Sequence, residues 1–96
     1  MDEKTLKEIK AGLGISADST GADEALKQKI AAVESYMMGG GVAKAMMTDP
    51  LAIGCIVVGV TDIWNLEAGE IKFSPLFGIL MEQLKARSGE ETENDV

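Results

Sequence analysis

The fold of this chain is decided by one apolar stretch, DPLAIGCIVVGVTDIW, at residues 49–64. No side chain in its interior, residues 51–60, is polar, and five of the ten are β-branched, which also suits a buried strand. Asp49 before Pro50 favours a helix, because Asp supplies an N-cap acceptor and Pro presets φ at the next position. The stretch is also too long for a typical strand, since the next breaker is Gly69.

A helix over 50–66 would gather six apolar side chains on one face: Ile53, Ile56, Val57, Val60, Ile63 and Trp64. The opposite face is apolar as far as the last turn: Leu51, Cys55, Val58 and Asp62. A helix that is apolar nearly all round needs cover on more than one side. Gly54 and Gly59 each cost about 1 kcal/mol of helix propensity relative to alanine, so we expect neighbouring backbone to approach closely at both.

Three further segments have the spacing of amphipathic helices. Their apolar stripes are Leu6, Ile9 and Leu13, then Leu26, Ile30, Val33 and Met37, and finally Leu76, Phe77, Leu80 and Leu84. We therefore predict an all-α fold, a small bundle of about four helices at 2–12, 22–38, 50–66 and 75–87 around the central apolar helix. The bundle forms a single domain over residues 1–88. Because four acidic residues crowd the end of the chain, we predict a disordered acidic tail over 89–96.

Composition excludes several classes of function. The 96 residues carry a net charge of −7, which argues against binding phosphate backbones. There is no histidine, the commonest general base and transition-metal ligand, and no convincing carboxylate pair, so we expect no enzyme, metal or cofactor. Cys55 is expected to be a small buried hydrophobe; with no signal peptide, the chain is expected inside the cell. The apolar run is too short to cross a membrane.

The polar positions of the first half suggest no site. Lys4, Lys7 and Lys10 alternate with acids, and we interpret them as a solvated face. Asp18, Thr20 and Asp23 fall near calcium-loop spacing, but Ala22 fills a ligand position and Asp23 the required glycine position, so we reject that site. Thr20 followed by Asp23 resembles a helix-start capping pattern instead.

Methionines lie on both sides of a flexible connection at Gly39–Gly41, after which 42–47 is expected to form one helical turn. They are Met37, Met38, Met46 and Met47. Methionine pairs beside a hinge could form an adaptable binding surface, or they could fill gaps in a small core. The first interpretation leads to an alternative function, a small helical regulatory protein that binds a partner protein through this Met-rich hinge region.

Two segments carry a resemblance to a known family: Val60-Thr61-Asp62-Ile63-Trp64-Asn65, and Gly69-Glu70-Ile71-Lys72-Phe73-Ser74-Pro75-Leu76-Phe77. They resemble small phage head–tail connector proteins, the head-completion adaptors that are also described as putative DNA-packaging proteins. The layout of the front half is similar too, and the resemblance covers roughly residues 5–87. It implies an all-α subunit of a ring of about twelve copies that joins the portal to tail-adaptor proteins while DNA passes through. It implies no catalysis, and a location in the virion connector after assembly in the host cytoplasm.

Within these segments, Trp64 has two interpretations: a core aromatic on the face of Val60 and Ile53, or an anchor for a subunit or portal contact, a role in which Trp is over-represented. Asp62 and Asn65 could hold the 71–74 segment through backbone hydrogen bonds, or could be solvated at a helix end. The candidate interface or loop-anchoring residues are therefore Asp62, Trp64, Asn65, Phe73, Met46 and Met47. A carboxylate enzyme and an acidic DNA mimic are the remaining, less favoured functions.

Overall fold

The computed structural model describes residues 3–64 and 73–94, and of residues 89–94 the backbone alone. Its elements are the helices α1 (Glu3–Gly12), α2 (Asp23–Gly39), α3 (Pro50–Trp64) and α4 (Pro75–Asn94), with a 3-10 helix, η1 (Lys44–Thr48), between α2 and α3. There is no strand in the described part, and the all-α prediction is confirmed. The stretch that could have been a strand is α3.

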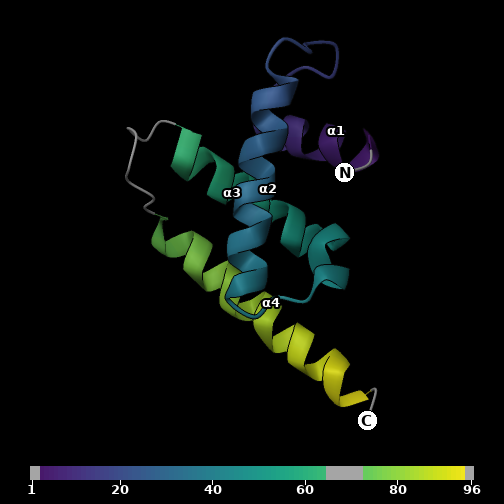
Figure 1. Ribbon diagram of the computed structural model, residues 1–96, viewed down its shortest axis with the longest axis vertical. Helices are drawn as coiled ribbons and strands as arrows, with labels where there is room; N and C mark the ends of the chain where they lie inside the picture. The colour runs from purple at the N-terminus through teal and green to yellow at the C-terminus, as the bar shows by residue number, and fades with distance from the viewer. Residues whose placement is uncertain (1–2, 65–72, 95–96) are drawn as a thin grey trace.

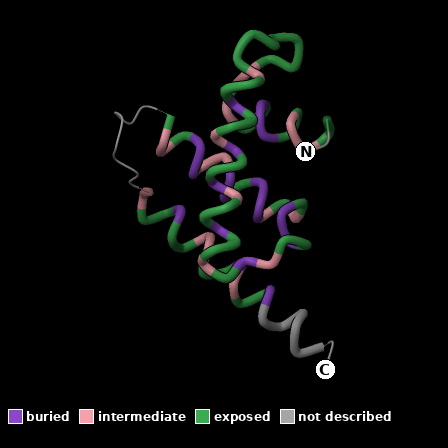
Figure 2. Tube along the Cα trace, viewed as in Figure 1, coloured by how far each residue is buried: buried purple, intermediate pink, exposed green. Residues whose placement is uncertain are grey.

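Helix α3 is the centre of the bundle, and α1, α2 and α4 each pack against it. Figure 1 shows α2 crossing α3, and α4 running back alongside α3. The expectation that an apolar helix needs cover on several sides is therefore met. Figure 2 shows buried positions along all four helices. The core consists of Ile9, Leu26, Ile30, Val33, Met37, Val42, Met46, Met47, Ala52, Ile53, Cys55, Ile56, Val60, Phe77 and Leu84.

The start of α3 is capped as the sequence predicted. Asp49 Oδ1 accepts a hydrogen bond of 2.9 Å from the backbone N–H of Leu51. The same oxygen accepts one of 3.1 Å from Arg87 Nη1 of α4. Asp49 thus satisfies one of the free N–H groups of the first turn and ties this end of α3 to α4.

The two glycines of α3 behave differently. A Cβ at Gly59 would lie 2.8 Å from Val33 Cγ1 and 2.8 Å from Phe77 Cε2, so α2 and α4 approach closely there through side chains instead of the backbone that was expected. A Cβ at Gly54 would meet nothing within 4 Å, and Gly54 is exposed. The prediction for Gly54 was wrong because this residue lies on a side of α3 that no other described helix covers.

The glycine connection after α2 is fixed against α4. The methyl group of Met81 occupies the position that a Cβ at Gly40 would take. Gly41 has φ of 112°, a conformation that favours glycine. Beyond it, the backbone N–H of Ala43 donates a 2.9 Å hydrogen bond to Ser88 Oγ. Gly40 therefore allows a close approach to α4, and Gly41 allows the turn.

Helix α4 differs from its prediction in length and in the face it buries. It continues to Asn94 instead of ending near Arg87, so the backbone of residues 89–94 is helical where a disordered tail was predicted. Gly89 costs only about 1 kcal/mol and no proline follows, so a helix that is already nucleated can extend. Leu76, expected in the apolar stripe, is 52% exposed, because Phe77 is the residue that fills the space beside Gly59.

Candidate interaction surface

The junction between α3 and α4 is held by Asp62. One oxygen, Oδ2, accepts hydrogen bonds from both the backbone N–H and the hydroxyl of Ser74, each at 2.8 Å. The Ser74 hydroxyl oxygen in turn accepts a 3.4 Å bond from the N–H of Phe77, in the first turn of α4. This is the loop-anchoring arrangement that was one of the two alternatives for Asp62. Its predicted companion, Asn65, lies outside the described residues.

Phe73 is part of an aromatic cluster. Its ring stacks on Phe77 at 4.2 Å between centroids and lies 4.7 Å from the ring of Tyr36. Phe77 is buried and Phe73 half-buried, whereas Tyr36 is exposed. Since aromatic pairs of this kind add to the burial they accompany, the cluster fixes Phe73 against α2 and α4 next to the Ser74 cap. Tyr36 is the most exposed member of the cluster, and Phe73 is partly exposed beside it.

Trp64 is not a core residue. It is 38% exposed, and the ammonium of Lys29 lies 5.2 Å from its ring centroid, within cation–π range. The core interpretation was wrong because the face with Val60 and Ile53 turns inward, whereas Trp64 lies beside the exposed Thr61. Together with Thr61, Leu13 and Ile15, Trp64 lines an open groove of about 370 Å³.

Two more large apolar side chains are exposed on α4, where Leu76 is 52% and Ile79 57% exposed. They lie three residues apart and so share one side of the helix. Trp64, at the end of α3, and Tyr36, which contacts Phe73 and Phe77, are exposed as well. Scattered apolar residues are normal on a surface, but a group near one helix junction is a candidate contact region.

The methionines beside the glycine connection lie largely inside. Met37, Met46 and Met47 are buried, which agrees with gap-filling in the core, and Met38 alone of the four is exposed, at 39%. Met38 and an edge of Met47 line a second groove, of about 420 Å³, with Glu34 and Lys44 at its polar side. Burial raises the pKa of the Glu34 carboxyl. Met46 and Met47, proposed as interface residues, therefore present little surface to a partner.

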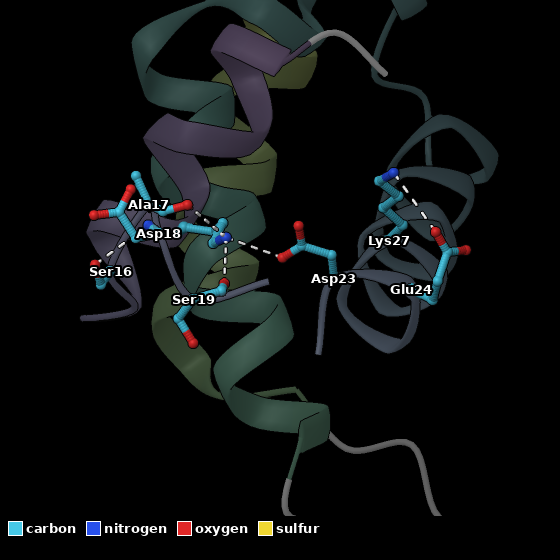
Figure 3. A network of polar contacts seen from close by, with 8 residues as sticks. Ser16, Ala17, Asp18, Ser19, Asp23, Glu24 and Lys27 are labelled. Atoms are coloured by element: carbon cyan, nitrogen blue, oxygen red, sulfur yellow. Dashed lines mark hydrogen bonds and ion pairs between the residues drawn. The ribbon is translucent and has the colours of Figure 1, made fainter. Parts of the chain in front are cut away.

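Lys10 is the polar residue that sequence reasoning misplaced. Instead of being solvated, it is 2% exposed, and its ammonium donates to Ser19 O at 2.6 Å and to Asp23 Oδ1 at 2.9 Å (Figure 3). The predicted capping pattern at Thr20 was wrong too, since no side chain caps α2 and Asp23 bonds Lys10 instead. The spacing of α1 did indicate that Lys10 is buried, because Lys10 follows Leu6 by four residues and therefore lies on the apolar edge of the helix.

Comparison with family models, with curated proteins and with solved structures finds no match to this chain. Across residues 3–64 and 73–88, whose side chains the structure describes, no three acidic or thiol side chains converge as a metal site would require. No helix of this described part combines the length and the hydropathy needed to cross a bilayer.

Proposed function

We propose that this protein is a structural subunit of a phage or prophage head–tail connector ring, which joins the portal to the tail and lets DNA pass. The supporting observation is the pairing of Asp62 with Ser74. These residues belong to the two sequence segments that carry the resemblance, and two 2.8 Å hydrogen bonds join them. Because the two segments contact each other where α3 and α4 meet, there is a physical reason for both to occur in the same protein.

The same junction leaves apolar side chains for assembly. Trp64, Leu76 and Ile79 are exposed at 38%, 52% and 57%, and Trp is over-represented among the residues that anchor protein contacts. Ring formation needs two different surfaces on each subunit, in contact head to tail. The ring would contain about twelve copies, and its other partners would be portal and tail-adaptor proteins in the virion connector, after assembly in the host cytoplasm.

The charge of the chain suits a channel that does not retain DNA. With a net charge of −7, the protein repels a polyanion, and this keeps a passing duplex mobile. The proposal therefore includes no sequence-specific contact with DNA. Tight, salt-dependent binding of duplex DNA by the isolated protein would contradict it.

The decisive experiment is a mass measurement of assemblies by native mass spectrometry or light scattering, with the protein alone and with a phage portal ring. We expect rings, formed alone or on the portal. Trp64→Ala should abolish them with at most a small fall in the melting temperature, because Trp64 lies outside the core. Met38→Ala is the matched control: Met38 is equally exposed, at 39% against 38%, but lines the other groove, so assembly should persist. A defined 1:1 complex with a cellular protein, and no ring, would favour the regulatory alternative.

A further inference from the structure

The ammonium of Lys10 is surrounded by oxygen atoms in the way that a bound cation would be. Three oxygens face it: the carbonyls of Ala17 and Ser19, at 3.4 and 2.6 Å, and Asp23 Oδ1, at 2.9 Å. An ammonium has three N–H donors, so the number of acceptors matches the number of donors. The Lys10 side chain is only 3% exposed. The loop thus surrounds the charge with oxygen and excludes water from it.

The loop of residues 16–22 depends on the charge of Lys10 for its attachment to α1. Its other hydrogen bonds are local: Ser19 N–H to Ser16 O at 3.0 Å, Asp23 N–H to Thr20 O at 3.2 Å, and Asp18 N–H to Ser16 Oγ at 3.3 Å. Residues 16–22 are all exposed, so no apolar burial fixes them. Among the described contacts, it is Lys10 that ties this part of the loop and the start of α2 to α1 (Figure 3).

We propose that residues 17–23 form an ammonium-binding site that the chain fills with its own Lys10, and that this site latches α1 onto the central helix. The end of α1 lies directly over α3, since a Cβ at Gly12 would come within 2.7 Å of Val57 Cγ2. Leu13 and Ile15, which follow α1, form one wall of the groove beside Trp64. Ile9 still holds α1 in the core, so release of the ammonium loosens the end of α1 over Val57 and displaces that wall of the groove. This inference stands independently of the connector proposal.

The first test removes the charge and keeps the stem. In Lys10→Met, hydrogen exchange at the Ser19 and Asp23 amides should become at least tenfold faster, and exchange in α1 should accelerate with it. Lys7→Met is the matched control, because Lys7 lies on the same helix but is exposed, and its exchange should equal that of the wild type. Exchange in Lys10→Met that equals the wild type would overturn the proposal.

The second test refills the site. Lys10→Ala leaves a vacancy of the length of n-propylammonium, and this cation should restore slow exchange in a saturable way. 1-Propanol has a similar shape without the charge and should not restore it. If Lys10→Ala does not fold, the same two compounds are compared for recovery of a cooperative thermal transition, and recovery with the amine alone supports the site. Equal effects of both compounds, or no effect of either, would overturn it.

Discussion

Asp62 and Ser74 are twelve residues apart, yet one carboxylate oxygen of Asp62 accepts both the N–H and the hydroxyl of Ser74, each at 2.8 Å. The serine so held is also the N-cap of α4, through the N–H of Phe77. The end of one helix and the start of the next therefore share a single polar joint. Phe77, two residues into α4, is the side chain that packs against Gly59 at the centre of the core.

Asp62→Ala should lower the free energy of unfolding by about 2 kcal/mol, because two hydrogen bonds to a charged acceptor are lost. Urea denaturation measures this. A double-mutant cycle with Ser74→Ala should give a coupling energy of about 1 kcal/mol or more, since both changes remove the same bonds. Additive effects of the two substitutions would show that the bonds contribute nothing to stability. Lys4→Ala, at an exposed position, should change stability by less than about 0.5 kcal/mol.

The two glycines of α3 should respond to alanine with opposite signs. Gly59→Ala should destabilise by about 1–2 kcal/mol, because the overpacking against Val33 and Phe77 exceeds the gain in helix propensity. Gly54→Ala should stabilise by about 0.5–1 kcal/mol, since the space there is open. Thermal or urea unfolding of the two variants provides the comparison. A stabilised Gly59→Ala would mean that α2 and α4 can move away from α3 at little cost.

Replacing Asp49 should reduce stability more than replacing Arg87, its ion-pair partner. Asp49→Ala removes both the cap on the Leu51 N–H and the pair with Arg87, and should cost about 1–2 kcal/mol. Arg87→Ala removes only an exposed ion pair and should cost about 0.5 kcal/mol or less. Raising the salt concentration should reduce the second effect and leave most of the first. Equal losses in the two variants would assign the stabilisation to the ion pair.

Cys55 should make the protein less stable in alkali. Burial raises the pKa of its thiol from 9.0 to about 11. Between these values the folded state keeps a proton that the unfolded state loses, so the free energy of unfolding falls as the pH rises from about 9 to 11. Stability curves of the wild type and Cys55→Ala should show a shallower decline for the variant. Identical slopes would refute the assignment, as would rapid reaction of the native thiol with a disulfide reagent at pH 8.

The sequence allowed the prediction of what depends on helical period and local caps. The α2 stripe of Leu26, Ile30, Val33 and Met37 is buried throughout, and Asp49 caps α3 where Asp-Pro indicated it. Both features rest on spacing within one element. The periodicity of α4 was ambiguous, because Leu76 and Phe77 are adjacent and only packing against Gly59 decides which of them turns inward.

The features that escaped prediction depend on contacts between elements. The partner of Lys10 lies thirteen residues away, beyond a loop whose course no local pattern specifies. Trp64 was harder still, since its apolar neighbours suggested a core position and only the placement of the covering helices leaves it exposed. Of the candidate site, Asp62 and Phe73 were recognised from motif residues, whereas Leu76 and Ile79 are identified as surface residues only by the way α4 is turned.

The position of the Met81 methyl group over Gly40 has an evolutionary consequence. A side chain at 40 would displace this methyl group, which is the far end of a flexible side chain, so Met81 would have to adopt another rotamer. Homologues that carry alanine or serine at 40 should therefore have a flexible or a smaller residue at 81, whereas a bulky, rigid residue at 81 should occur together with glycine at 40. Covariation of positions 40 and 81 among homologues would test whether the glycine connection and α4 depend on each other.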